Sequence, residues 1–213
     1  MTQNRRYFGY GSNLDWDDWV AFCRKHNANP DGLMERAPAW LVEHHLKFHY
    51  YSSGRKGGAA DVVSINTYHA TPGVLFDVDE EAWTTLGRKE GAPNYYEEKE
   101  VLVIESDGTL QKATSFVVCE HRQKPDFVQP TDEYRQLIHD GLEHRGLPTF
   151  GLNQALQHSF DQPTINHLFV YGTLMSGQNR FNQLKPYLRS STKGSTKGQL
   201  HHLGSFHGLK LGD

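Results

Sequence analysis

The sequence predicts an α+β fold in which helices flank a small, mostly antiparallel β-barrel. Strand-like runs recur at short spacing through the middle of the chain, and segments with helical spacing are few. Asp107-Gly108 separates two runs of alternating polar and apolar residues, which is a hairpin signal. No apolar run reaches the roughly 18 residues that a membrane-spanning helix requires.

The chain opens with a predicted strand over residues 5–10, which are rich in aromatic side chains. Gly11 and Ser12 then turn the chain, and Asn13 is expected to cap a helix that runs to about Arg24. A strand that stops in a glycine turn before a helix leaves backbone N–H groups unpaired, and such groups can hold an anion. The plainer interpretation is a strand–turn–helix junction without a ligand.

The middle of the chain predicts strands over 39–52, 59–66 and 71–78, where β-branched and aromatic residues are frequent. A helix is predicted over 79–91, with Asp79 as its N-cap and a glycine at its end.

After the hairpin, residues 129–148 predict the clearest helix of the chain, which Thr131 can cap. Its apolar side chains form one stripe at helical spacing and are expected to face the core: Tyr134, Leu137, Ile138 and Leu142.

Glu90 is the first candidate for chemistry, because it lies at the C-terminal end of the predicted helix over 79–91. The negative end of the helix dipole raises the pKa of a carboxyl group there, and enclosure by Trp83, Tyr95 or Tyr96 would raise it further. A general base that works near neutral pH needs such a shift. The alternative is a solvated glutamate beside Lys89.

The composition, charge and short motifs of the chain limit the classes of protein to which it is expected to belong. The 213 residues carry a net charge of −3, so no basic field for nucleic acid or anionic membranes is expected. Two distant cysteines, Cys23 and Cys119, are expected to be free thiols of a cytoplasmic protein. The 13 histidines match no metal-ligand spacing, and neither GxGxxG nor a P-loop occurs.

Four motifs in order resemble the γ-glutamylcyclotransferase family: YFGYGSNL, RKGGAADVV, GRKEGAPNYYEEKEV and the helix DEYRQLIHDGLEHRGLP. Together they cover about residues 5–148. The resemblance implies a small β-barrel with flanking helices and an enzyme that cyclises γ-glutamyl groups. Such enzymes release 5-oxoproline and a free amine or amino acid, without metal or organic cofactor.

The resemblance also assigns roles to residues. The family's substrate-binding loop corresponds to Tyr10, Gly11, Ser12 and Asn13, and its acid/base glutamate corresponds to Glu90, followed by glycine. The family's site tyrosine corresponds best to Tyr96, although Tyr95 is adjacent. Three basic residues are candidates to bind a substrate carboxylate, and the sequence does not choose among them: Arg55, Lys56 and Arg88.

The alternative hypothesis is that the protein is not an enzyme but a binding or regulatory module, which uses the same loop to bind a carboxylate ligand. Glu90 discriminates between the two hypotheses, since a module that only binds would not need it. The substrate is a small molecule under both hypotheses. A γ-glutamyl amino acid is favoured by Asn13, and γ-glutamyl amines remain open.

A second stretch, FVYGTLMSGQNRF, resembles the γ-glutamylamine cyclotransferase or AIG2-like branch of the family through Tyr171, Gly172, Thr173 and Leu174. It predicts a strand, a loop and a helix, followed by the beginning of another strand. The position that corresponds to Glu90 would fall after Asp213. The expected organisation is therefore a catalytic domain over 1–148, a linker over 149–164 and a partial second unit over 165–213. About 50 residues rarely support a core alone, so packing, strand swapping or homodimer contacts would keep this unit ordered.

Overall fold

A computed structural model describes residues 5–65, 69–161, 168–191, 193–194, 196, 198–204 and 207–211. The chain divides into two compact units, Met1–Ile165 and Asn166–Asp213, which are described separately. The end of the strand predicted over 59–66 and the last residues of the predicted linker lie outside the described residues.

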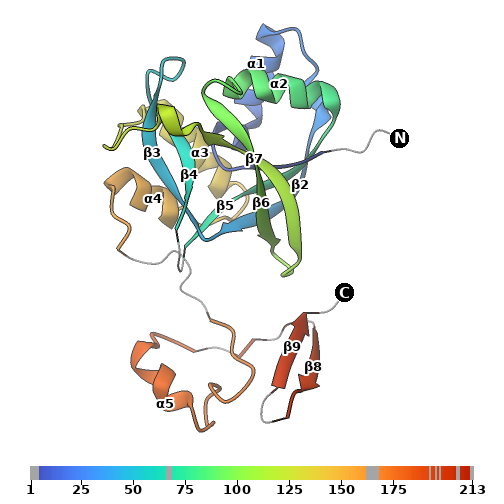
Figure 1. Cartoon of the computed structure of the whole chain (residues 1–213), viewed down its shortest axis with the longest axis vertical. Coiled ribbons are helices and arrows are strands. Elements are labelled where there is room, and N and C mark those ends of the chain that lie inside the picture. The colour runs from blue at the N-terminus through green and yellow to red at the C-terminus, as the bar shows by residue number, and fades with distance from the viewer. Residues whose placement is uncertain are drawn as a thin grey trace. The chain divides into compact units, whose positions relative to one another are not determined.

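The first unit is built on a closed five-stranded barrel, as the sequence predicts (Figure 1). β1 pairs with β5 antiparallel and with β7 parallel, and the other pairs are antiparallel. In barrel order the strands are β1 (Arg5–Gly9), β5 (Ala70–Val78), β2 (Leu33–Val42), β6 (Tyr96–Glu105) and β7 (Leu110–Val118).

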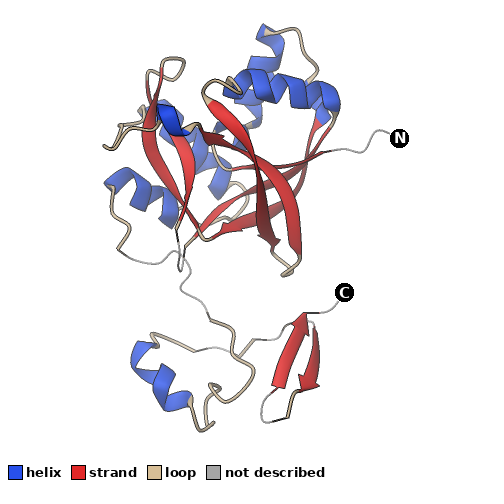
Figure 2. Ribbon diagram, in the orientation of Figure 1, coloured by secondary structure: helices blue, strands red, loops and turns tan. Residues whose placement is uncertain are grey.

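A separate two-stranded sheet is formed by β3 (His44–Ser52) and β4 (Gly57–Ser64) (Figure 2). The single strand predicted over 39–52 is therefore wrong. Glu43 adopts a left-handed conformation with φ of 57°, which breaks the strand and lets β2 and β3 enter different sheets.

Helices α1, α2 and α3 of the first unit begin at side-chain caps, whereas Thr149 makes no capping hydrogen bond at the start of α4. Asp79 caps α2 and Thr131 caps α3, as predicted. The prediction that Asn13 caps the first helix is wrong, because Asp15 accepts the capping hydrogen bond from the backbone N–H of Asp18. The α-helices of this unit are α1 (Trp16–Lys25), α2 (Glu80–Glu90), α3 (Asp132–Glu143) and α4 (Phe150–Gln157), and its 3-10 turns are η1 (Ser12–Leu14), η2 (Pro30–Gly32) and η3 (Glu120–Arg122).

Most of the segment predicted as a linker belongs to the first unit instead. Leu152 and Ala155 of α4 are buried in the same apolar core as the barrel strands. Phe160 packs against that core and stacks on His45 of β3, with ring centroids 4.2 Å apart. These apolar side chains draw the segment onto the barrel because exposing them to water would cost free energy.

The core of the first unit is continuous and rich in aromatic side chains. Trp19, Phe8 and Phe48 are fully buried, and Cys23 and Cys119 are buried free thiols. No helix among the described residues is long and apolar enough to cross a membrane.

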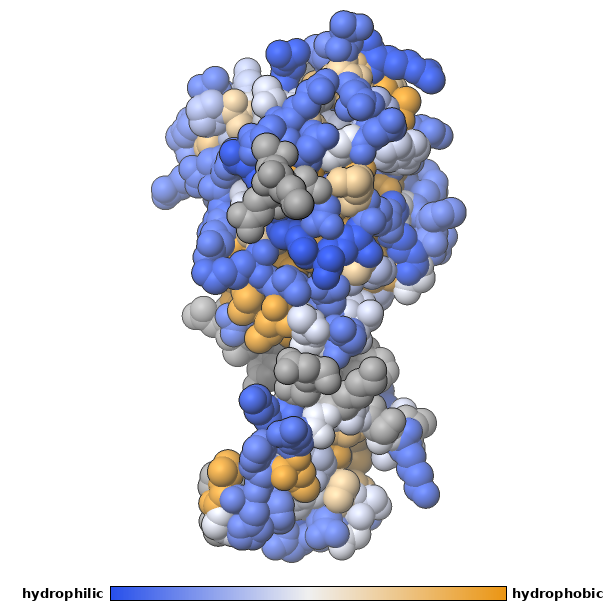
Figure 3. Space-filling model, turned by 90° about the vertical axis from the view of Figure 1, so that its right-hand side faces the viewer, coloured by the Kyte–Doolittle hydropathy of each residue, from blue (hydrophilic) through white to orange (hydrophobic). Residues whose placement is uncertain are grey.

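The second unit has little internal packing. Its elements are α5 (Phe181–Leu184), η4 (Lys185–Tyr187) and a hairpin of β8 (Gly198–His202) and β9 (His207–Leu211). None of the side chains described between 168 and 210 is buried, and apolar residues appear on the surface of this unit in Figure 3. A strand is predicted before Tyr171, and 168–170, the described residues of that segment, make no strand pairing.

Candidate active site

The predicted site residues line one pocket of about 270 Å³ in the first unit. It lies where the end of β1 meets the end of α2, the start of β6 and helix α3. The lining residues are Tyr7, Tyr10, Gly11, Ser12, Asn13, Ala60, Glu90, Tyr96, Phe116 and Tyr134.

The loop after β1 forms one wall of this pocket. The Tyr10 hydroxyl donates a hydrogen bond to the carbonyl of Phe116 in β7, which fixes the loop against the barrel. The backbone N–H groups of Gly11 and Ser12 have no acceptor among the described residues. These two N–H groups can therefore donate to oxygen atoms of a bound ligand.

Asn13 connects the loop to α2. Its side-chain Nδ2 donates to Glu90 Oε1 at 2.7 Å and to the Tyr7 hydroxyl at 2.8 Å. Its Oδ1 accepts from Lys89 Nζ at 2.6 Å. Because Asp15 caps α1, the buried Asn13 amide is available for these contacts.

Glu90 is the last residue of α2, where Gly91 ends the helix in a left-handed conformation with φ of 67°. Burial raises the pKa of Glu90, while Lys89, Asn13 and Arg55 oppose this rise. Its Oε1 is held by Asn13, and its Oε2 makes no hydrogen bond to a described residue. One carboxylate oxygen is thus fixed and the other is available to a ligand.

A charged cluster borders the pocket. Arg55 donates to both carboxylate oxygens of Asp18, at 2.8 and 2.7 Å, and to the Ser12 hydroxyl at 2.9 Å. Lys89 also donates to Asp18, at 2.7 Å. Burial alone would raise the pKa of Asp18, but the bonds from Arg55 and Lys89 outweigh it and lower this pKa to about 2. Burial lowers the pKa of Lys89.

Among the three basic candidates, Arg55 lies at the pocket. Its guanidinium carbon is 5.1 Å from the centre of the Tyr134 ring, and its side chain is 28% exposed. Lys56 and Arg88 are exposed.

Tyr96 lines the pocket, whereas Tyr95 is 42% exposed and packs against Arg122. The Tyr96 hydroxyl donates to the carbonyl of Ala60 at 2.8 Å, and the N–H of Ala60 donates to the Tyr134 hydroxyl at 3.2 Å. Burial raises the pKa of Tyr134 to about 12 and that of Tyr96 well above its usual value. Both phenols therefore stay protonated at neutral pH.

Sequence reasoning missed four residues of this region: Tyr7, Asp18, Lys89 and Tyr134. Tyr134 belongs to an apolar helical stripe, which predicts only core packing. Asp18 lies in an acidic first helical turn, which the helix dipole explains. No pattern within either segment indicates the pocket, because the contacts join residues far apart in the sequence.

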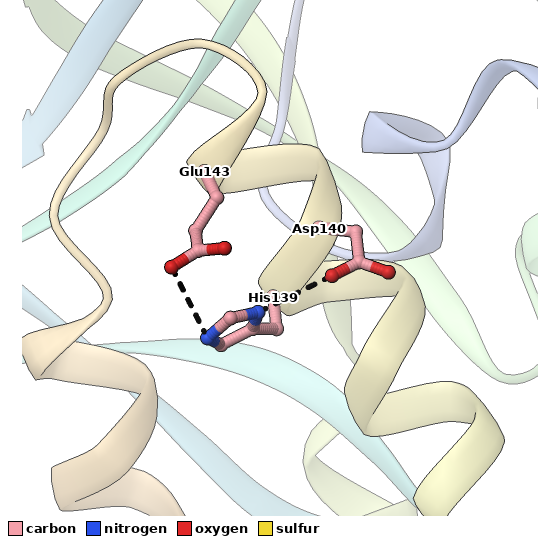
Figure 4. A group of neighbouring side chains, drawn as sticks. All are labelled: His139, Asp140 and Glu143. Carbon is pink, nitrogen blue, oxygen red and sulfur yellow. Dashed lines mark hydrogen bonds and ion pairs between the residues drawn. The ribbon is translucent and has the colours of Figure 1, made fainter.

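A side-chain cluster outside the pocket could hold a metal by its chemistry. His139, Asp140 and Glu143 of α3 place their ligand atoms within 4.8 Å of one another (Figure 4). The carboxylate side chains are 58% and 63% exposed. A contact between adjacent residues and an i,i+4 contact on the exposed face of one helix account for this cluster, so we assign it no function.

Comparison with known proteins gives one family match. Residues 71–151 match the model of the AIG2-like family. No curated protein matches the chain significantly.

Solved structures share the fold of the first unit. A γ-glutamyl cyclotransferase is 22% identical with a TM-score of 0.59, over 79% of this chain and 94% of that chain. An uncharacterized human protein is 23% identical with the same TM-score and the same coverage. A yeast γ-glutamyl cyclotransferase specific to glutathione is 14% identical, with a TM-score of 0.51, over 76% of this chain and 99% of that chain.

The family match and the common barrel agree with the resemblance that the four motifs indicate. The first unit therefore has the fold of γ-glutamyl cyclotransferases of known structure, and residues 71–151 within it are similar to the AIG2-like family.

Proposed function

We propose that the first unit is a cyclotransferase that converts γ-glutamyl amino acids or amines to 5-oxoproline and the free amino acid or amine. The observation that carries the proposal is the pocket carboxylate of Glu90, which faces the Tyr10–Asn13 loop and is held by Asn13. The shared fold supports a reaction of this class. Soluble small molecules are the proposed substrates.

The reaction requires the enzyme to hold the substrate in a folded conformer and to transfer a proton. The α-amino nitrogen attacks the γ-carbonyl carbon, a five-membered ring forms, and the bond from that carbon to the leaving nitrogen breaks. An enzyme that holds the folded conformer can lower the barrier by up to about 7–11 kcal/mol. The pocket is lined by both the Tyr10–Asn13 loop and Glu90, so a γ-glutamyl group bound there would contact the two elements together.

Glu90 is the proposed general base and acid. Its free Oε2 accepts a proton from the α-ammonium group and returns it to the leaving nitrogen. Burial raises the pKa of Glu90 toward the pKa of the α-ammonium group. The smaller difference between the two pKa values favours proton transfer near neutral pH. Asn13 holds the other oxygen and so fixes the direction in which Oε2 points.

The N–H groups of Gly11 and Ser12 are proposed to hold substrate oxygens, including the oxyanion that develops on the γ-carbonyl. Preorganised donors of this kind are worth roughly 3–4 kcal/mol each when they face a developing charge. Arg55 is the proposed partner of a substrate carboxylate, because its guanidinium contacts Ser12 at the pocket and is partly accessible.

The test is release of 5-oxoproline from a panel of γ-glutamyl amino acids and amines, with wild type and Glu90→Gln compared. Glutamine keeps the shape and can still accept from Asn13, so the protein should fold while kcat falls roughly 10²- to 10⁴-fold. Wild-type turnover by Glu90→Gln would refute the assignment. No product with any substrate, together with stabilisation by a γ-glutamyl compound, would favour the binding module.

A further inference from the structure

A buried histidine–aspartate pair lies behind the pocket and takes no part in the proposed chemistry. Asp61 of β4 and His49 of β3 are 1% and 3% exposed, and His49 Nε2 is 2.7 Å from Asp61 Oδ2. Removing such groups from water is costly unless both are hydrogen-bonded. An arrangement of this kind in a small domain calls for a structural or functional reason.

The local backbone is shaped to make this contact. Phe48 pairs with Ala60 and Tyr50 pairs with Ala59, so His49 is the extra residue of a β-bulge. A bulge turns a side chain away from the direction that regular alternation would give it. Here the bulge coincides with the histidine that contacts Asp61.

Asp61 also joins two sheets that share no strand pairing. Its Oδ1 accepts from the backbone N–H of Val118 at 2.9 Å and from that of Val62 at 2.9 Å. Val118 ends β7 of the barrel, whereas Asp61 lies in the separate β3–β4 sheet. One carboxylate therefore links the β3–β4 sheet to the barrel.

Three pocket tyrosines are anchored beside these attachment points. Tyr96 and Tyr134 are hydrogen-bonded to the backbone of Ala60, the residue before Asp61. Tyr10 is hydrogen-bonded to the carbonyl of Phe116, two residues before Val118. A shift of β4 relative to β7 would move all three phenols with respect to Glu90.

The charge of Asp61 acts on the same phenols. After burial, Asp61 is the largest contribution that raises the pKa of Tyr10, and it also raises that of Tyr96. Glu90 contributes in the same direction at both tyrosines. The Tyr10 and Tyr96 phenols consequently stay protonated and donate to the carbonyls of Phe116 and Ala60.

We propose that Asp61 and His49 are positioning residues for the cyclotransferase site, which hold β4 against β7 and thereby fix the pocket tyrosines around Glu90. This inference rests on the proposed function for its kinetic test. It assigns a role to a buried pair that neither contacts the substrate pocket nor belongs to its lining.

The principal test is Asp61→Asn. Asparagine can still accept from Val118 and donate to His49, so the fold should persist without the charge. We expect kcat to fall roughly 10- to 100-fold, because small displacements at a site cost that much, with KM nearly unchanged. Both limbs of the kcat–pH profile, of which Glu90 sets the acid one, should stay where they are in wild type.

Thr71→Val is the matched control. It removes another buried hydrogen bond, from Thr71 Oγ1 to the carbonyl of His44, at a residue outside the pocket. This variant should lose stability but keep wild-type kcat and both limbs. His49→Gln, which retains a donor for Asp61, should keep more activity than His49→Phe, which does not.

Wild-type kcat in Asp61→Asn would overturn the inference. So would equal kcat in His49→Gln and His49→Phe. If wild type itself forms no 5-oxoproline, the proposed function fails instead. Phenolate absorbance then still decides: Asp61→Asn should ionise tyrosine at lower pH than wild type, and the additional change Tyr96→Phe should remove part of that signal. An unchanged titration would refute the role of Asp61.

Discussion

The two Tyr-Gly-Ser/Thr loops of this chain begin alike but differ in their surroundings. The first has a buried Tyr10 and an Asn13 that holds Glu90, whereas Tyr171 of the second is 41% exposed. The residues before Tyr10 pair with β5 and β7, whereas 168–170, which are described directly before Tyr171, pair with no strand. A loop sequence thus becomes a site only when other parts of the fold enclose it.

The second unit also lacks the chemistry of the first. No Asp or Glu occurs between residues 166 and 212, so no carboxylate there can act as Glu90 does. We propose that 166–213 is a partial cyclotransferase-like unit, since it repeats the loop without the residues that would complete a pocket.

The largest expected difference between the two units is in their rate of cleavage by a protease. Trypsin should cut after Arg180 or Arg189, which are exposed, roughly 10²-fold or more faster than within 5–161, because cleavage in a packed core requires opening. Mass spectrometry of the digest against time measures this. Equal resistance of both units would mean that 166–213 is an integrated part of a stable structure.

Exchanging the fourth residue of the loops should give the next largest effect. Asn13→Leu gives the first loop the residue that the second loop has at position 174. It removes the amide that is hydrogen-bonded to both Glu90 and Lys89. We expect kcat/KM for 5-oxoproline release to fall about 100-fold, the loss typical of a misplaced acid/base group. The reciprocal Leu174→Asn should change nothing. Retained activity in Asn13→Leu would show that Glu90 needs no support from the loop.

Substitution of Arg55 should lower activity less than Asn13→Leu and should depend on the substrate. In the described part of the second unit, no residue makes a contact like that of Arg55 with Ser12. γ-Glutamylalanine and γ-glutamylethylamide differ only in the carboxylate of the leaving group. Arg55→Met should lower kcat/KM by about 10-fold if one charge-assisted contact worth 1.5–3 kcal/mol is lost. A loss confined to γ-glutamylalanine locates the contact at the leaving group. An equal loss on both substrates assigns it to the glutamyl carboxylate, and no loss removes Arg55 from substrate binding.

The smallest expected effect is on acid stability. Burial, together with the neighbouring His69 and Lys47, lowers the pKa of His45 to about 4. The unfolded chain therefore binds a proton at this residue near pH 6.5, whereas the folded chain binds it only near pH 4. Stability that is present above about pH 6.5 should be lost as pH falls toward 4, by about 1–2 kcal/mol.

Denaturant unfolding of wild type and His45→Phe at several pH values measures this contribution. The variant should have a flatter pH dependence, because it carries no proton at residue 45. His201→Phe in the exposed hairpin of the second unit is the matched control and should behave as wild type. Equal slopes for His45→Phe and wild type would exclude His45 as the source.

Local sequence determined where several helices and one hairpin of the first unit begin or end. The caps at Asp79 and Thr131, the hairpin at Asp107-Gly108 and the glycine that ends α2 depend on neighbouring residues, which is why their patterns predict them. The motif resemblance also selected residues that share one pocket: Tyr10, Gly11, Ser12, Asn13, Glu90 and Tyr96.

Tertiary structure decided the rest, because it depends on contacts between distant residues. The sequence could not show that Asp15 rather than Asn13 caps α1, or that Arg55 rather than Lys56 or Arg88 reaches the pocket. The burial that raises the pKa of Glu90 also arises only when the loop after β1 closes over the end of α2. The second loop has the same opening residues, but in the described structure no such enclosure forms around it.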